Sequence, residues 1–197
     1  MLKRCFDLLV STFGIIILSP ILIVIAFSIK LTSSGPILFR QTRVGRNEQL
    51  FNIHKFRTMT INAEKSGLLT IGNDKRVTFI GKILRKSKLD ELPQLFDVLI
   101  GKMSLVGPRP EVPKYVDYYP AEVKKIIFNL RPGITDFASI KMIDENLLLA
   151  KESNPEQYYV EKILPQKLGY AVKYAKTHSL FLDIYIIWLT LVKIVKR

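Results

Sequence analysis

The sequence predicts an α+β protein that is mostly α-helical and begins with a re-entrant membrane helix-break-helix hairpin. Three observations support this fold class: an uncharged apolar segment near the N-terminus, two short alternating segments typical of a β-hairpin, and helical periodicity in most of the remainder. The 197 residues are 48% hydrophobic, which is enough for one sizeable core. We therefore expect a single domain over residues 1–197, with the hairpin over 1–31 and a compact cytoplasmic helical part with interfacial amphipathic helices over 32–197.

The apolar segment over residues 8–29 has the length needed to cross the hydrocarbon core of a bilayer. Ser19 and Pro20 lie at its middle, where proline removes a helical hydrogen bond and disfavours helical geometry at the preceding residue. Basic residues flank the segment on both sides, including Lys3 and Lys30, so the positive-inside rule draws both ends to the cytoplasm. We expect a hairpin broken at Ser19 and Pro20, with an ordinary kinked transmembrane helix as the alternative.

The charge balance shows that the chain beyond this segment is strongly basic. Of the formal net charge of +13, the first thirty residues contribute +2 from three basic residues and one acid, which leaves +11 downstream. Such a surface attracts phosphorylated substrates, anionic membrane lipid or nucleic acid. No groove-reading or base-stacking motif accompanies the charge, so nucleic acid is not an expected partner. Cys5 is the only cysteine, which excludes an intramolecular disulfide.

Several segments have the periodicity of defined elements. Residues 37–43 and 49–56 are predicted strands, and their basic side chains form either a solvated face or a docking face for phosphates. Helical patterns follow over 76–85 and 92–99. The final stretch from residue 179 has one apolar helical face, typical of an interfacial helix, with core packing as the alternative. The residues of that face are Phe181, Ile184, Tyr185, Trp188 and Val192.

Asp90 and Glu91 are adjacent carboxylates among basic residues that include Arg85 and Lys88. Two neighbouring acids repel each other and at least one pKa rises unless a cation neutralises them. A divalent cation or phosphate-binding arginines would account for the pair, which makes it the candidate reaction centre. The structural alternative is a helix start, because acids and Pro93 are favoured in a first turn.

Arg109 lies between Pro108 and Pro110, which hold its backbone stiffly extended. A guanidinium group on such a rigid segment suits bidentate recognition of phosphate. A salt bridge to Glu111 is the alternative.

Eight short motifs occur in order between residues 3 and 135, and together they resemble the bacterial sugar transferases. The likeness is to the small monotopic phosphoglycosyl transferases that consist of the catalytic domain only. The motifs are Lys-Arg-x-Phe-Asp at 3–7, Ser19-Pro20, Phe39-Arg-Gln-Thr-Arg-Val-Gly45, Lys55-Phe-Arg-Thr-Met59, Arg76-Val-Thr78, Leu89-Asp-Glu-Leu-Pro-Gln-Leu95, Ser104-Leu-Val-Gly-Pro-Arg-Pro110 and Arg131-Pro-Gly-Ile-Thr135.

The resemblance implies transfer of a sugar 1-phosphate from a UDP-sugar to polyprenyl phosphate, which releases UMP and begins a bacterial surface glycan. It implies Mg²⁺ as cofactor, an active site on the cytoplasmic face of the inner membrane, and a possible homodimer. Asp90 would be the nucleophile that carries the phosphosugar, and Glu91 would bind Mg²⁺. Arg85 and Arg109 would bind substrate phosphates. Asp183 matches a further acid near the family's site, with a helix-start role as the alternative.

Residues 134–140 depart from the commoner family pattern, since Asp136 and Ser139 replace a glycine and a glutamine. We expect this change to affect sugar recognition more than chemistry. Two other functions remain open on the sequence. One is a direct transferase whose acids only bind Mg²⁺. The other is a non-catalytic basic membrane adaptor that binds anionic lipid or nucleic acid, whose function would not depend on Asp90.

Overall fold

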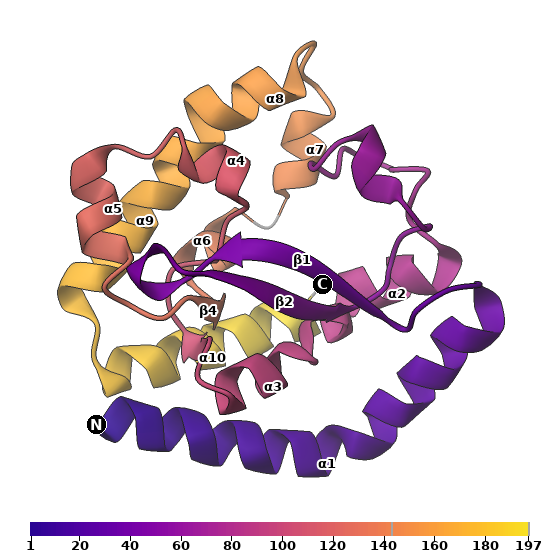
Figure 1. The fold of residues 1–197 in the computed structure, drawn as a ribbon, viewed down its shortest axis with the longest axis horizontal. Helices are drawn as coiled ribbons and strands as arrows, with labels where there is room; N and C mark the ends of the chain where they lie inside the picture. The colour runs from indigo at the N-terminus through magenta and orange to yellow at the C-terminus, as the bar shows by residue number, and fades with distance from the viewer. Residues whose placement is uncertain (143, 197) are drawn as a thin grey trace.

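The computed structural model describes residues 1–142 and 144–196. A long N-terminal helix, α1 (Leu2–Thr32), runs along one side of the molecule, and the other elements gather above it (Figure 1). The other α-helices are α2 (Phe79–Ser87), α3 (Gln94–Leu99), α4 (Pro113–Val116), α5 (Ala121–Ile127), α6 (Phe137–Lys141), α7 (Glu145–Leu149), α8 (Pro155–Tyr158), α9 (Leu164–Thr177) and α10 (Leu180–Val195). The predicted class, α+β with mostly helix, is confirmed.

Helix α1 is continuous over its 31 residues and contains Pro20. Figure 1 shows it bending about midway, as expected where proline removes a backbone donor. The prediction of two half-helices separated by a break at Ser19 and Pro20 is therefore corrected to one bent helix. Its mean hydropathy reaches 2.7 over an 18-residue window of which 11% is buried, so by length and composition it could cross a membrane.

Two small sheets lie above α1. The predicted β-hairpin is confirmed: β1 (Leu38–Val44) pairs antiparallel with β2 (Leu50–Phe56), and Leu38 lies opposite Phe56. The second sheet pairs β3 (Ser104–Val106) in parallel with β4 (Gly133–Thr135), a pairing that the sequence did not predict.

Two glycines, Gly107 and Gly133, allow the backbone segments at this second sheet to approach each other closely. A Cβ atom on Gly133 would lie 2.1 Å from the backbone nitrogen of Gly107, so glycine is required there. The Gly133 N–H donates to the carbonyl of Pro108 at 3.0 Å. The β3–β4 sheet therefore anchors the start of the segment that carries Arg109.

The apolar core joins the hairpin to the helices. Its central cluster contains Phe51, Ile53, Leu95, Val98, Met103, Leu105, Val106, Ile140, Tyr174 and Ile186. A separate cluster, formed by Ile25, Ile29, Phe56 and Leu84, packs the second half of α1 against β2 and α2. The loop between α2 and α3, which carries the acid pair, is thus held between two packed regions.

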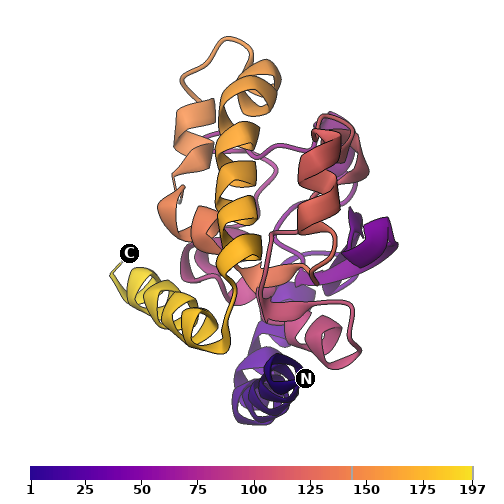
Figure 2. The same cartoon turned by 90° about the vertical axis from the view of Figure 1, so that its left-hand side faces the viewer.

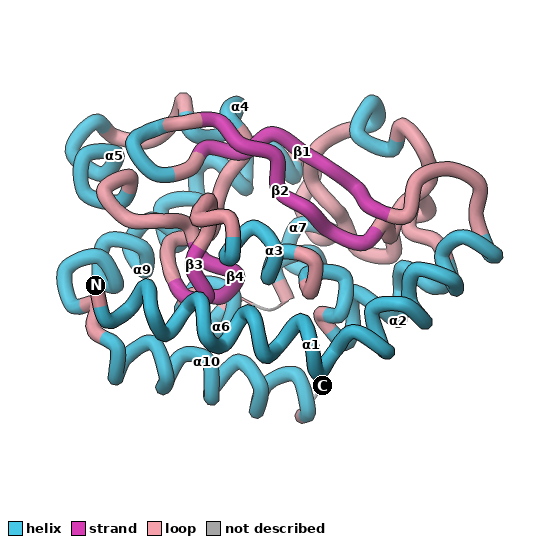
Figure 3. Tube along the Cα trace, turned by 60° about the horizontal axis from the view of Figure 1, so that its bottom comes forward, coloured by secondary structure: helices cyan, strands magenta, loops and turns pink. Residues whose placement is uncertain are grey.

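Helices α1 and α10 lie along the same side of the molecule (Figures 2 and 3). Both expose large apolar side chains, and α10 leaves Phe181, Trp188 and Val195 more than half exposed. Exposed apolar surface of this extent marks a membrane or a protein interaction site. The predicted interfacial character of the last helix agrees with this exposure, whereas core packing holds only for its other face, at Ile186.

Candidate active site

The acid pair lies in a 3₁₀ turn over Leu89–Glu91, between α2 and α3. Helix α2 ends at Ser87, and the positive φ of 59° at the next residue, Lys88, turns the chain sharply before the acids. The Ser87 hydroxyl donates to the carbonyl of Ile83 at 2.9 Å and caps no helix. Helix α3 begins only at Gln94, after Pro93. The Ser87 side chain therefore forms no helix cap with the acids, whereas Asp90 and Glu91 do lie in the first turn of the short 3₁₀ helix that precedes α3.

Glu91 is buried, with 8% of its surface exposed, and is held by two cations. Lys55 Nζ lies 2.8 Å from Oε1, and Arg109 donates to both carboxylate oxygens. Burial would raise the pKa of Glu91, but the charges of Arg109 and Lys55 outweigh it and hold that pKa well below its usual value. Glu91 is therefore ionised and fixes the Arg109 fork in one orientation.

Asp90 differs from its neighbour, although it is equally buried at 7% exposed. Its Oδ1 atom is buried and has no hydrogen-bond partner among the described residues. Burial, and then the charge of Glu91, raise the pKa of Asp90. A buried acceptor without a partner is costly, and such atoms in a cavity point to a ligand or a reacting group.

Arg85 also lines the cavity beside Asp90. Its Nε donates to the Thr58 hydroxyl at 2.9 Å and its Nη1 to the Thr70 hydroxyl at 3.0 Å. Both partners are neutral, and within residues 1–142 and 144–196 no carboxylate lies within 4.0 Å of Arg85. Its charge is therefore available to a phosphate. Burial lowers the pKa of Arg85 from its usual value.

All four predicted residues, Asp90, Glu91, Arg85 and Arg109, line one cavity of about 410 Å³. The alternative of a salt bridge from Arg109 to Glu111 is wrong, because Arg109 binds Glu91 and the Glu111 carboxylate accepts from Arg43 at 3.0 Å instead.

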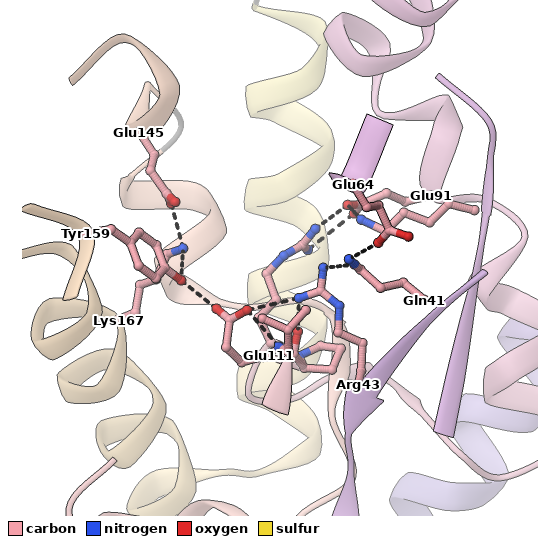
Figure 4. A network of polar contacts seen from close by, with 12 residues as sticks. Gln41, Arg43, Glu64, Glu91, Glu111, Glu145, Tyr159 and Lys167 are labelled. Carbon is pink, nitrogen blue, oxygen red and sulfur yellow. Dashed lines mark hydrogen bonds and ion pairs between the residues drawn. The ribbon is translucent and has the colours of Figure 1, made fainter. Parts of the chain in front are cut away.

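The cavity wall contains a polar network that the sequence did not predict (Figure 4). The Tyr159 hydroxyl donates to Glu111 at 2.5 Å, and Lys167 pairs with Glu145 at 2.7 Å. Arg43 Nη2 donates to the Gln41 side chain at 2.5 Å. These residues come from β1 and the C-terminal half, far apart in sequence. The sequence pointed to this network only through the basic side chains of the predicted hairpin. Two of these side chains, Arg43 and Lys55, line the cavity.

Asp183 does not join this site. It is 1% exposed, pairs with Lys3 Nζ at 2.5 Å, and accepts from the Tyr174 hydroxyl at 2.6 Å. Asp7 belongs to the same region, where it accepts from Ser104 Oγ at 2.8 Å. The structure thus places Asp183 in a cluster that ties α10 to the start of α1, and this corrects its assignment as a candidate near Asp90.

Comparison with known proteins identifies the family of the chain. The pattern that defines the family described as "Bacterial sugar transferase" matches residues 1–197. The chain belongs to the bacterial sugar transferase family. The resemblance seen in the eight motifs is therefore confirmed.

Several relatives of this chain are named for one kind of reaction. A UDP-glucose:undecaprenyl-phosphate glucose-1-phosphate transferase of Klebsiella pneumoniae is 38% identical over 194 residues, covering 97% of this chain and 39% of the relative. An Aeromonas hydrophila UDP-N-acetylgalactosamine-undecaprenyl-phosphate N-acetylgalactosaminephosphotransferase is 36% identical, covering 96% and 43%. An Escherichia coli glucose-1-phosphate transferase is 35% identical, covering 98% and 40%. The chain thus spans about two fifths of the length of these relatives.

Proposed function

We propose that this transferase moves a sugar 1-phosphate from a UDP-sugar to polyprenyl phosphate, at the start of bacterial surface glycan or glycoconjugate synthesis. The observation that carries the proposal is the pair of contrasting acids. Glu91 is held ionised by Lys55 and Arg109, whereas Asp90 keeps a buried oxygen without a partner in the same cavity. The names of the relatives, which specify UDP-sugars and undecaprenyl phosphate, support the choice of substrates.

The reaction proceeds in two displacements at one phosphorus atom. A carboxylate oxygen of Asp90 attacks the sugar-bearing phosphorus of the UDP-sugar, and the bond from that phosphorus to the bridging oxygen breaks, so UMP leaves with the electron pair. A phosphate oxygen of the polyprenyl phosphate then attacks the same phosphorus, and Asp90 leaves as a carboxylate. Arg85 and Arg109 bind non-bridging phosphate oxygens in both steps and offset the charge that accumulates there.

Mg²⁺ is the proposed cofactor, and the residues present fit it. No group of three or more His, Cys, Asp or Glu side chains that could hold a metal occurs in the part of the chain that the structure describes. Mg²⁺ commonly binds through one or two carboxylates together with substrate phosphates, which the free oxygen of Asp90 and the side chain of Glu91 would supply. When bound, the cation would neutralise phosphate charge.

The protein is proposed to be monotopic, with its site on the cytoplasmic face of the inner membrane. Both ends of α1 are attached to the same body: Arg4 donates to the carbonyl of Val98 at 2.7 Å, and Arg57 donates to Ser33 Oγ at 2.7 Å. A straight helix of this length would place its ends on opposite sides of a bilayer. Attachment at both ends, together with the bend at Pro20, supports re-entry into one face.

The test is UMP release from purified protein with Mg²⁺ and a panel of UDP-sugars, with and without undecaprenyl phosphate. One UDP-sugar should give catalytic UMP release only when the acceptor is present. Absence of UMP release with every UDP-sugar and the acceptor would contradict the proposal, and it is the result that a non-catalytic membrane adaptor would give.

A further inference from the structure

A second, smaller cavity of about 150 Å³ adjoins the active site. Lys88, Glu91, Arg109 and Ser139 line both cavities, so the two meet next to the candidate reaction centre. The apolar lining of the smaller cavity comes from α3, β4, α6, α10 and the turn before α3. These apolar residues are Leu92, Leu95, Ile134, Ile140 and Ile194. A site of this composition suits the junction between an anionic group and a hydrocarbon chain.

Three polar groups at this cavity lack a partner within the described residues. Lys88 and Lys193 make no ion pair there, and neither ammonium group donates a hydrogen bond. The Ser139 hydroxyl is buried and likewise unpartnered. Two ammonium groups and one hydroxyl donor beside Arg109 are complementary in charge to a phosphate.

The apolar wall continues onto the surface that faces away from the core. Helix α10 contributes Thr190, Lys193 and Ile194 to the cavity, while the adjacent face of the same helix exposes Trp188 and Leu191 at 56% and 58%. Figure 3 shows α10 at the margin of the molecule beside α1. A hydrocarbon chain leaving the cavity would therefore pass directly onto exposed apolar surface.

We infer that this cavity receives the acceptor lipid, with the first prenyl units against Leu92 and Ile194 and the phosphate between Lys88, Lys193 and Ser139. The inference rests on the proposed function, which supplies the acceptor. It assigns the donor and the acceptor to separate cavities that share Glu91 and Arg109. The UDP-sugar then enters through the larger cavity, and the lipid enters from the apolar side.

The test compares Lys193→Glu with the matched control Lys196→Glu, which lies three residues further on, directly after the end of α10, and outside the cavity lining. Binding of undecaprenyl phosphate to the detergent-solubilised protein, measured by native mass spectrometry, requires no turnover. Lys193→Glu should weaken binding about tenfold, because a cation near the phosphate becomes an anion. Lys196→Glu should bind as the wild type does. Ile194→Trp, which fills the cavity without changing charge, should also weaken binding.

Kinetics assign the cavity to one substrate. Lys193→Glu should raise the KM for undecaprenyl phosphate about tenfold and leave the KM for the UDP-sugar within about twofold. Wild-type lipid binding in both Lys193→Glu and Ile194→Trp would overturn the inference, as would a rise confined to the UDP-sugar KM. Equal weakening by Lys196→Glu would also overturn it, since it would indicate charge attraction by the whole helix. Failure of the proposed function is distinguishable, because it would abolish UMP release while the binding measurement still reported on the cavity.

Discussion

Arg109 donates to both carboxylate oxygens of Glu91, and this bidentate contact orients the guanidinium group inside the cavity. Its Nη1 also donates to the carbonyl of Ile134 at 3.2 Å, so the side chain is held by β4 as well. The remaining N–H donors of the fork are those that a phosphate would meet. Glu91 thus acts on the substrate partly through Arg109, in addition to its proposed contact with Mg²⁺.

Arg109→Lys should lower kcat/KM for UMP release on the order of 100-fold, because lysine keeps the charge but loses the planar fork. The matched control is Arg40→Lys, an exposed position on the hairpin, which should change activity less than about twofold. Circular dichroism checks that both variants fold. Full activity of folded Arg109→Lys would leave Arg109 with only a structural role.

The attachment of α1 at both ends predicts its topology. Single cysteines at exposed Leu2 and Leu31, in a Cys5→Ser background, should both be labelled from the cytoplasmic side of the inner membrane. Labelling of one end only from the periplasm would establish a spanning helix. Pro20→Ala restores a backbone donor and should shift part of the population towards spanning.

The Lys3–Asp183 pair predicts a loss of stability without a loss of chemistry. Asp183→Asn removes the buried negative charge that pairs with Lys3, and this should lower the free energy of unfolding by about 2 kcal/mol. Denaturant unfolding measures this loss, and Asp117→Asn at an exposed position is the control. The folded Asp183→Asn protein should keep kcat and both KM values within about threefold. A selective loss of kcat at unchanged stability would instead return Asp183 to the catalytic residues.

The sequence predicted the site better than it predicted the surroundings of the site. Asp90, Glu91, Arg85 and Arg109 were identified because each lies within a short local motif, and the structure brings all four to one cavity. The Glu111–Tyr159 contact spans 48 residues, and no local pattern encodes such a pairing. The parallel pairing of β3 with β4 was missed for the same reason, since each strand has only three residues.

The pKa of Asp90 predicts how stability depends on pH. Burial and the charge of Glu91 raise this pKa, so the folded protein binds that proton more tightly than the unfolded chain does. The stability contributed by the carboxyl is therefore present below the unfolded value of about 3.9 and is lost as pH rises through the folded value. In metal-free buffer, Asp90→Asn should raise the Tm at pH 7 and raise it less at pH 4. A Tm at pH 7 no higher than that of the wild type would contradict this account.

The distinct environments of the two acids predict distinct effects of removing each charge. With Mg²⁺ and the correct UDP-sugar, but without undecaprenyl phosphate, the wild type should release one equivalent of UMP and retain the phosphosugar on the peptide that contains Asp90. Asp90→Asn should abolish both signals, because the attacking oxygen is lost. Glu91→Gln should slow UMP release about 10- to 100-fold, since Lys55 and Arg109 lose their shared anion, and added Mg²⁺ should restore part of the rate.

Mass spectrometry of the quenched reaction distinguishes the covalent route from direct transfer. The adduct should map to the peptide with Asp90 and disappear when undecaprenyl phosphate is added, with the polyprenyl diphosphate sugar appearing in equal amount. Asp117→Asn, an exposed acid outside the cavity lining, is the control and should form the adduct at the wild-type rate. Acceptor-dependent turnover with no adduct after rapid quenching would favour direct transfer, in which Asp90 and Glu91 serve only as ligands of Mg²⁺.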